Sequence, residues 1–485
     1  MSKRTILLLQ PTIGYMDSWR SAPSLPLALL HASTFAAQRY HVRLFDQRLN
    51  PQWKIALRHE IETTQPILIG ATMFLGQAVA NSLRMLEEAK RICKAPTVIG
   101  GVLPSLMPED CLADTRVDYV VQGEGEKAIL ELARCLENHE VPSSVSGIWF
   151  RNENRISGTK HTELLHLDLL PEIPYHLIPV EKYLPRYGGI SSFYMETSRG
   201  CPLSCTYCFN PEFNHGVWRA QSAQHVRERL AFAKNKFNMK DVYFVDDNFF
   251  IDIKRGLEIA KAMGQFGLRW QVQGVGISSL KKMSDEELRF LSENGLRRMT
   301  VGLESGSPKI KKILGKHYTN EEVKDVISRL KEFKIIVYCS FMCNLPGETH
   351  DDVKQSIILM FDLMKLNPNF RSSPFYNYAP SPGTALFHAA VQEGFKPPKS
   401  LEQWARISFD GNETEISGSN NARFYKGLYI ATLFSDRKPH EYSTSFFFRI
   451  LAFLYKPIAR FRLKKMFFYL MPEINLFYWM IKPRN

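Results

Sequence analysis

The amino-acid sequence predicts an α/β protein with a doubly wound N-terminal domain, a partial (β/α)6 barrel and a mostly helical C-terminal region. The first observation behind this prediction is that short apolar runs, typical of buried strands, alternate with helical patterns in two separate stretches of the chain. The second is length, because 485 residues exceed the size at which one hydrophobic core usually stops growing. We expect the N-terminal domain at residues 1–136, a connector at 137–190, the barrel at 191–385 and the C-terminal region at 386–485.

The N-terminal domain is expected to be flavodoxin-like or Rossmann-like, with a parallel sheet covered by helices on both faces. An amphipathic helix is predicted at Ala78–Cys93. The predicted strands are Ile6–Leu9, Val42–Phe45, Ile67–Thr72, Thr97–Ile99 and Tyr119–Val121. Ligands of such folds bind beyond the carboxyl ends of the strands. The residues at those ends are Pro11, Asp46, Thr72, Gly100, Gly101 and the segment Gly123–Glu126.

The connector lacks a sustained period and is rich in proline, which predicts loops with one hairpin around Gly147–Arg155. A second alternation of strands and helices begins near Ser192. Six strand–helix units fit a partial TIM barrel, whose active site lies at the carboxyl ends of the strands. The strand candidates are Phe193–Thr197, Val242–Val245, Trp270–Val275, Met299–Leu303, Ile335–Met342 and Ser372–Tyr378, and helices are predicted at Ala223–Lys236, Ile253–Phe266, Asp285–Asn294 and Asn320–Phe333.

Composition and charge limit the classes of protein. A hydrophobic content of 45% and a charged content of 23% are ordinary for a globular enzyme. The net charge of +13 suggests an anionic partner, such as a phosphate-bearing cofactor, a nucleic acid or a membrane surface. No apolar stretch is long enough to span a bilayer, and no secretory signal is recognisable. The eight cysteines are not spaced like a disulfide framework, so we expect a reducing compartment, the cytoplasm.

Three of these cysteines, Cys201, Cys205 and Cys208, lie within eight residues directly after a predicted strand. Three thiolates on one short loop can bind three irons of a cubane cluster and leave the fourth iron open to a substrate or cofactor. Gly200 allows the backbone to approach such a cluster closely. The alternatives are three buried apolar cysteines, or a zinc site completed by His215.

The spacing Cys-x3-Cys-x2-Cys, with Tyr207 before the last cysteine, resembles the signature of the radical S-adenosylmethionine (SAM) superfamily. Further segments resemble the family's later strands, namely Phe244–Phe249, Val301–Ser307, Leu345–Thr349 and Pro380–Thr384. The resemblance implies a [4Fe–4S] cluster that reductively cleaves SAM. It also implies a set of residues near SAM: Tyr207, Phe209, Asp246, Asp247, Glu304, Ser305, Asn344, Pro346, Gly347 and Tyr378.

Four of these assignments carry qualifications from the residues themselves. Asn344 stands where the family usually has glycine, which affects how SAM's adenine is held. For the carboxylates, which lie at predicted strand ends, hydrogen bonding to neighbouring backbone is the alternative role. These carboxylates are Asp246, Asp247 and Glu304.

A doubly wound domain before such a barrel is similar to the cobalamin-binding class of radical SAM enzymes. That class carries Gly-Gly-x-x-Pro and Gly-Glu-Gly-Glu segments, and this chain has Gly100–Pro104 and Gly123–Glu126. The segment Asp46–Arg48 contains no histidine, so it supplies no axial imidazole to cobalt. The residues implied for corrin binding are Pro11, Asp46, Thr72, Gly100, Gly101, Pro104, Gly123, Glu124 and Gly125. The alternative is a domain that binds no corrin and serves as a lid.

The resemblance predicts cobalamin-dependent methyl transfer to an unactivated carbon. A cyclase or another carbon–carbon bond-forming or rearranging enzyme of the same architecture is the alternative within enzymes. A non-catalytic corrin or iron–sulfur sensor is the alternative from another class. The expected partners are a small-molecule or lipid substrate and an electron donor such as flavodoxin or ferredoxin.

The C-terminal region changes character near its end. From Arg437 to Asn485 the chain has ten Lys and Arg against two Glu, interleaved with thirteen aromatic residues. This pattern favours either a helical cap packed on the barrel or peripheral contact with the inner face of a membrane. No nucleic-acid-binding module is recognisable, so we expect no nucleic-acid partner.

Overall fold

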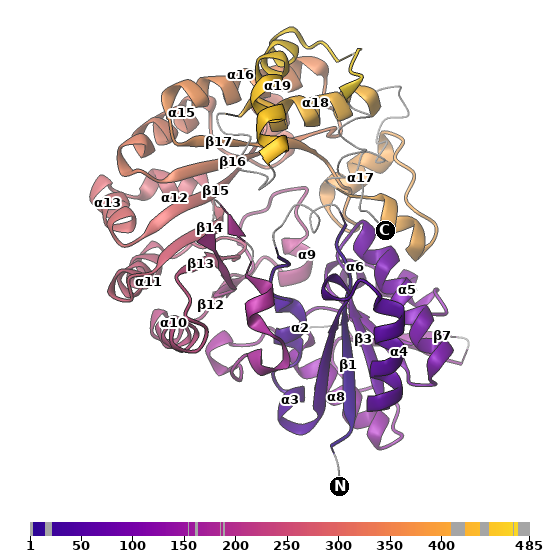
Figure 1. The fold of residues 1–485 in the computed structure, drawn as a ribbon. Coiled ribbons are helices and arrows are strands. Elements are labelled where there is room, and N and C mark those ends of the chain that lie inside the picture. The colour runs from indigo at the N-terminus through magenta and orange to yellow at the C-terminus, as the bar shows by residue number, and fades with distance from the viewer. Residues whose placement is uncertain are drawn as a thin grey trace.

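The structure is a computed structural model of the chain (Figure 1). It describes residues 3–14, 22–153, 155–160, 163–184, 186–187, 190–408, 422–436, 446–468 and 470–473. Two parallel sheets dominate it, one in each half of the chain, as the sequence predicts. The segments 437–445 and 474–485 of the basic, aromatic tail lie outside the described residues.

The first sheet has the order β2-β1-β3-β4-β5-β6-β7. Its first five strands pair in parallel in the flavodoxin-like order, which confirms the predicted strands. These strands are β1 (Thr5–Gln10), β2 (His41–Asp46), β3 (Leu68–Thr72), β4 (Thr97–Gly100) and β5 (Tyr119–Val121). Helices α4 (Trp53–Thr64) and α5 (Gln77–Ile92) lie on one face, and α2 (Leu27–Ala32), α3 (Ala36–Arg39) and α8 (Gly125–Glu137) on the other.

The connector contributes to this sheet. Its hairpin, β6 (Ile148–Asn152) and β7 (Arg155–Gly158), pairs antiparallel with β5. Gly158 lies under the Trp149 ring, where a Cβ would come within 2.3 Å of the indole. The hairpin therefore covers the edge that β5 would otherwise expose.

The second sheet has the order β10-β13-β14-β15-β16-β17, and all its strands are parallel. Helices α10 (Ala223–Phe237), α11 (Ile253–Gln265), α13 (Asp285–Glu293), α15 (Asn320–Arg329) and α16 (His350–Leu366) lie on its outer side (Figure 1). The predicted partial barrel is thereby confirmed. Its strands are β10 (Phe193–Met195), β13 (Asp241–Phe244), β14 (Arg269–Val275), β15 (Leu296–Glu304), β16 (Ile336–Cys343) and β17 (Phe370–Asn377).

The C-terminal region is divided between the two halves of the molecule. Helix α17 (Ala385–Gln392) and the 3-10 helix η6 (Leu401–Arg406) pack against the first half, with η6 on α5. Helix α18 (Ala422–Ser435) packs along β17, where Phe375 N–H donates to Thr432 Oγ1 at 2.9 Å. Helix α19 (Phe446–Lys465) lies over α18. The edge strand of the barrel is thus covered rather than exposed.

One hydrophobic core spans both halves. Met73 and Leu103 of the first half belong to the same buried cluster as Leu345, Tyr378 and Trp404. In the part of the chain that the structure describes, no helix is both long and apolar enough to cross a bilayer.

Candidate active site

The three cysteines of the predicted cluster lie on one loop at the carboxyl end of β10. This cluster loop, residues 200–209, runs from β11 (Ser198–Arg199) to α9 (Asn210–Asn214). Gly200 has a φ of 84°, and a Cβ there would lie 2.0 Å from the carbonyl oxygen of Val217. Only glycine fits that close approach without strain. The start of the loop is therefore fixed by packing against the chain that follows α9.

The cluster loop is also tied to other elements. Thr206 Oγ1 donates to the carbonyl of Ile313 at 2.8 Å, and Leu386 N–H donates to the carbonyl of Thr206 at 2.9 Å. Phe209 contacts Phe74 of the first half in an edge-to-face arrangement, with ring centroids 6.1 Å apart. The loop therefore lies at the junction of the two halves.

The thiols themselves are partly buried. Burial raises the pKa of Cys201 and raises that of Cys208 to about 12, and the neighbouring thiols add to both effects. Two donors point at sulfur: Asn210 N–H lies 3.4 Å from Cys208 Sγ, and Asn248 Nδ2 lies 3.7 Å from Cys201 Sγ. Such donors tune the potential of an iron–sulfur cluster. Three thiolates supplied by a single loop match the ligand number of a cubane with one open iron.

Neither the three thiols alone nor the thiols together with His215 form a preformed metal site among the described residues. Among the residues that the structure describes, no three His, Cys, Asp or Glu side chains are placed to hold a single metal ion. All eight cysteines carry free thiols.

Asp246 holds the chain just before the cluster loop, and Asp247 holds the first residue of the loop. Asp246 is buried and accepts from Thr197 N–H at 2.7 Å, Thr197 Oγ1 at 2.6 Å and Ser198 Oγ at 2.7 Å. Burial outweighs these donors and raises its pKa to about 6. Asp247 Oδ2 accepts from Gly200 N–H at 2.8 Å. The backbone role expected as the alternative is therefore present, and SAM contact by these two residues stays a proposal.

Glu304 joins the cluster loop to the barrel. Its φ is 64°, at a point where the register between β15 and β16 shifts. Tyr207 Oη donates to Glu304 Oε1 at 3.1 Å, and Ser340 Oγ lies 3.4 Å from both carboxylate oxygens. Burial raises the pKa of Glu304, although the positive Lys316 opposes this. The sequence did not single out Ser340 or Lys316. Ser340 lies on β16, and Lys316 lies on the loop that follows the helix Pro308–Ile313.

The turn after β16 is shaped by its unusual residue. Asn344 has a φ of 59°, and asparagine is the residue that, after glycine, most readily adopts this conformation. The departure from the family's glycine thus keeps the backbone shape. Glu348 Oε2 accepts from Asn344 N–H at 2.7 Å, and burial raises the Glu348 pKa to about 8. Gly347 N–H donates to Glu393 Oε2 at 2.9 Å.

The remaining residues predicted to bind SAM lie in the same neighbourhood. Ser305 Oγ lies 3.1 Å from Ser356 Oγ, and both hydroxyls are buried. Tyr378 N–H donates to the carbonyl of Cys343 at 2.9 Å, which places Tyr378 directly beyond β17 and beside the Asn344 turn. Pro346 follows Asn344 in that turn. The structure therefore brings the predicted SAM residues to the carboxyl ends of β13, β15, β16 and β17.

The two glycine segments of the first half meet through one serine. Ser105 Oγ donates to the carbonyl of Gly101 at 2.7 Å and accepts from Gly123 N–H at 2.9 Å. Gly101 has a φ of 106°, and a Cβ there would lie 2.4 Å from the carbonyl oxygen of Met73. Gly123 has a φ of 80°. The absence of a side chain at Gly101 lets its backbone pack against Met73, and the positive φ of both glycines sets the path of the two loops. Gly100 and Pro104 belong to the first of these two segments.

Two predicted corrin residues have their carboxylates engaged elsewhere. Asp46 forms a closed, buried ion pair with Arg48, with 2.7 Å between Oδ2 and Nη2. Glu124 points toward the barrel and pairs with Arg199 and Arg219. Corrin contact by either residue therefore stays a proposal. Pro11, Thr72 and Gly125 lie at the ends of β1 and β3 and at the start of α8, beside the same loops.

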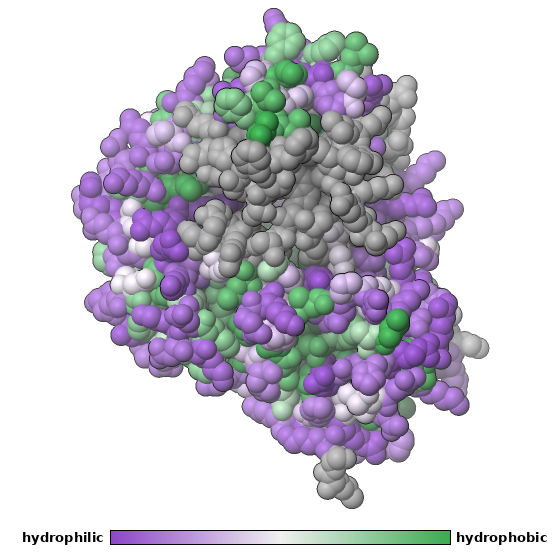
Figure 2. Space-filling model, in the orientation of Figure 1, coloured by the Kyte–Doolittle hydropathy of each residue, from purple (hydrophilic) through white to green (hydrophobic). Residues whose placement is uncertain are grey.

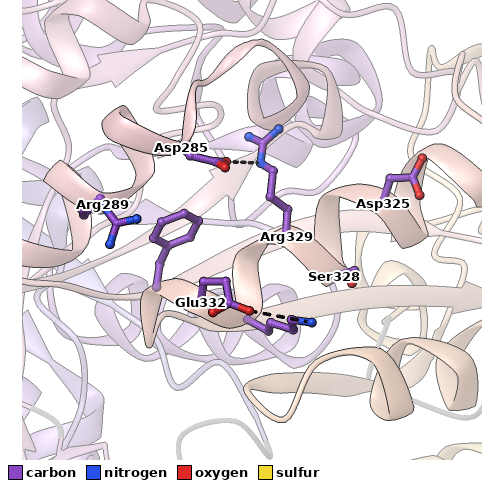
Figure 3. A pocket seen from close by; sticks show the side chains of 8 residues that line it. Asp285, Arg289, Asp325, Ser328, Arg329 and Glu332 are labelled. Carbon is purple, nitrogen blue, oxygen red and sulfur yellow. Dashed lines mark ion pairs between the residues drawn. The ribbon is translucent and has the colours of Figure 1, made fainter.

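A shallow pocket lies elsewhere (Figure 3). It lies on the outer side of the barrel between α13 and the end of α15, where Arg329 pairs with Asp285 at 3.0 Å and Lys331 pairs with Glu332. Glu332 shortly precedes β16, so the pocket lies toward the amino-terminal ends of the strands. Barrel enzymes use the opposite end.

Comparison with known proteins agrees with this geometry. Residues 195–360 match the radical SAM superfamily, and residues 22–133 match the B12 binding domain. The chain therefore contains a radical SAM domain preceded by a B12 binding domain. The predicted pair of domains and the predicted fold class are thereby confirmed, and the two matched domains are those of the predicted cofactor set, a [4Fe–4S] cluster with SAM and cobalamin.

Individual relatives divide between two chemistries. An uncharacterized methyltransferase of Pyrococcus horikoshii is 25% identical over 80% of this chain and 83% of its own length. An anaerobic magnesium-protoporphyrin IX monomethyl ester cyclase of Synechocystis is 23% identical over 62% of this chain and 58% of its own. The solved structure of the radical SAM methyltransferase TsrM from Kitasatospora setae, with tryptophan and a SAM analogue bound, is 18% identical with a TM-score of 0.70. The similarity covers 96% of this chain and 98% of TsrM, and it shows the shared fold.

Proposed function

We propose that this protein is a cobalamin-dependent methyltransferase that uses radical SAM chemistry to methylate an unactivated carbon of a small molecule or lipid. The observation that carries the proposal is that the cluster loop and the glycine loops of the B12-binding domain meet at one junction. Phe209 packs on Phe74, and Arg199 pairs with Glu124 across it. A methyl group carried by cobalamin and a radical generated from SAM must reach the same carbon, so both cofactors need this common junction.

The residues of this chain would hold the cofactors in position. When bound, the cluster provides the electron that cleaves SAM, and cobalamin carries the methyl group. Cys201, Cys205 and Cys208 would hold the cluster, and the backbone of the Asn344–Gly347 turn would border SAM. The loops at Gly101 and Gly123, where both glycines have a positive φ, would border the corrin with their backbone. The segment Asp46–Arg48 contains no histidine that could bind cobalt, and its two charged side chains pair with each other.

Methyl-labelled SAM tests this function without knowledge of the substrate. Anaerobically reconstituted protein is incubated with cobalamin, a reductant and SAM labelled in its methyl group. The label in the corrin is measured, and the amount of 5′-deoxyadenosine, which carries no methyl label, is measured separately. We expect labelled corrin, and labelled products when small-molecule and lipid extracts are added. Cleavage of SAM without label in any product would favour the cyclase alternative. Absence of 5′-deoxyadenosine after reduction would favour a sensor.

We also propose that helix α19 contacts an anionic membrane surface, which would place the enzyme at the cytoplasmic face of a membrane. Apolar side chains on its outer side are exposed, with Phe453 76% exposed and Phe461 58%. Leu454 and Ile458 extend the same stripe, and Figure 2 shows hydrophobic colouring at the top of the molecule, where α19 lies in Figure 1. Exposed Lys464 and Lys465 at the end of the helix match anionic headgroups.

Vesicle sedimentation tests this contact. The full chain should bind vesicles of anionic phospholipid more strongly than vesicles of phosphatidylcholine, and Phe453→Ser with Phe461→Ser should weaken that binding. The matched control is Phe232→Ser, because Phe232 is 43% exposed on α10 of the barrel. Equal sedimentation of wild type and the double variant would refute membrane contact and leave the methyltransferase proposal unaffected.

A further inference from the structure

A buried charge network joins the two halves of the molecule at the start of the cluster loop. Its centre is Arg199, whose side chain is 11% exposed. Arg199 Nη1 lies 2.9 Å from Glu124 Oε1, Nη2 lies 2.7 Å from Glu126 Oε1, and Nε donates to Glu196 Oε2 at 2.8 Å. One guanidinium thus holds three carboxylates, two of which belong to the B12-binding domain.

A second arginine completes the network. Arg219 donates to both carboxylate oxygens of Glu124, at 2.7 Å and 3.2 Å, and to the carbonyl of Leu165 at 2.7 Å. Burial would raise the Glu124 pKa, but Arg199 and Arg219 lower it to about 2. Burial, reinforced by Arg199, lowers the pKa of His31 to about 3, so this neighbour of Glu196 adds no positive charge near neutral pH.

The network continues to both kinds of cofactor loop. On one side Arg199 is followed directly by Gly200, which Asp247 and Val217 fix, and then by Cys201. On the other side Glu124 follows Gly123, which Ser105 links to Gly101. An unbroken series of hydrogen bonds, ion pairs and adjacent residues therefore runs from Cys201 to the two loops predicted to border the corrin. These two loops, at Gly100–Pro104 and Gly123–Glu126, are called the corrin loops below.

Stability alone is a weak explanation for this network. Burying charges costs desolvation free energy that ion pairing recovers only in part, so apolar residues often stabilise such an interface equally well. What a multidentate arginine adds is a fixed geometry, because its planar fork holds several carboxylates in set directions. The guanidinium of Arg199 would therefore fix the position of the cluster loop relative to the loop that carries Glu124 and Glu126.

We infer that Arg199 and Glu126 are positioning residues that set the distance and orientation between the cluster loop and the corrin loops. The inference rests on the proposed function only in requiring that one protein molecule bind both cofactors. Neither residue touches a reacting atom. Loss of the network should leave each cofactor bound but let their separation vary.

The distance between the two cofactors tests this directly. Full-length protein is reconstituted with cluster and cobalamin and poised so that the reduced cluster and cob(II)alamin each carry an unpaired spin. Pulsed dipolar EPR then measures the distribution of distances between the spins. We expect one narrow distribution in wild type and a broadened or shifted one in Arg199→Gln and Glu126→Gln, with iron, sulfide and corrin contents unchanged.

Two further variants make the result specific. Arg199→Lys keeps the charge but lacks the fork, so it should also broaden the distribution, and it keeps the test decisive if Arg199→Gln fails to fold. Arg329→Gln is the matched control, since Arg329 also makes several contacts but lies in the outer pocket of Figure 3, away from both loops. It should leave the distribution narrow.

A broad distribution of spin distances in the wild-type protein would overturn the inference. So would narrow, wild-type distributions in both Arg199→Lys and Glu126→Gln, or complete loss of one cofactor from both of these variants. The outcome is separable from the proposed function. A wild-type protein with a narrow distribution that transfers no labelled methyl group would refute methyl transfer and leave the positioning role intact.

Discussion

The cluster loop and the corrin loops are built by opposite means. The cluster loop is held through side chains: Thr206 bonds to Ile313, Tyr207 to Glu304, and Asp247 to Gly200. The corrin loops are defined by glycines with positive φ, at Gly101 and Gly123, and by the single hydroxyl of Ser105. A small cluster needs thiolates held firmly, whereas a large ring needs backbone with nothing projecting from it. Substitutions should therefore act differently in the two regions.

Removal of a cluster thiol should have the largest effect. Cys205→Ala leaves two thiolates for a cluster that needs three, so we expect iron and sulfide to fall to background and reductive SAM cleavage to be lost. Metal analysis and 5′-deoxyadenosine production measure this. Cys135→Ala, which changes a free thiol in the B12-binding domain, should retain both activities. Full SAM cleavage by Cys205→Ala would disprove the assignment of the cluster.

A side chain added to a corrin loop should act on the other cofactor alone. Gly101→Ala requires a left-handed backbone, costing about 1–2 kcal/mol, and brings Cβ against the Met73 carbonyl. We expect corrin affinity to fall at least about tenfold, as about 1.4 kcal/mol would produce, while iron content stays normal.

The control for Gly101→Ala is Gly267→Ala. Gly267 also has a positive φ, of 63°, but a Cβ there would meet nothing within 4 Å. Gly267→Ala should lower the stability of the protein as Gly101→Ala does, but leave the affinity for corrin unchanged. Equal corrin binding by wild type and Gly101→Ala, measured by absorbance titration, would contradict the assigned role of this loop.

The turn beyond β16 should give a pH dependence. The folded protein holds the pKa of Glu348 at about 8, above its ordinary value, so it binds a proton that the unfolded chain releases. The contribution of Glu348 to stability should therefore be greatest below the ordinary carboxyl pKa and fall as pH rises toward 8, by up to about 1.4 kcal/mol per pH unit. Urea unfolding of the protein without cofactors between pH 5 and 8 measures this. Glu348→Gln should flatten the slope, and an unchanged slope would exclude Glu348 as its source.

The smallest effect is expected at the hydroxyl that joins the glycine segments. Ser105→Ala removes the acceptor of Gly123 N–H, and one such hydrogen bond contributes about 1 kcal/mol, or about fivefold in corrin affinity. Ser292→Ala removes a comparable hydroxyl bond, to the Phe333 carbonyl, within the barrel and serves as the control. Corrin titration of both variants decides whether Ser105 shapes the loop.

The strands could be predicted from the sequence because the apolar pattern of each strand lies within a few consecutive residues. The run Ile6–Leu9 and the segment Ile335–Met342 carry the apolar character of buried strands, and both lie within the observed β1 and β16 to within a residue or two. The three cysteines were equally visible, since all three lie within eight residues. The assignment of individual SAM and corrin contacts stays a prediction.

Long-range pairings were beyond the reach of local patterns. Arg199 meets Glu124 across 75 residues of chain, and Arg219 meets the same carboxylate across 95. Nothing in the segment before Cys201 distinguishes such an arginine from a solvated one. The division of the C-terminal region, with Trp404 packed on the first half and Thr432 on β17, depends in the same way on the assembled fold.

The shared apolar core has a consequence for how substrate enters. Because Met73, Leu345 and Trp404 belong to one continuous buried cluster, swinging the two halves apart would expose that cluster to water. Interfaces between mobile domains are usually more polar than this. Substrate access to the region between the cluster loop and the loops at Gly101 and Gly123 should therefore depend on local displacements of the surrounding chain rather than on separation of the two halves.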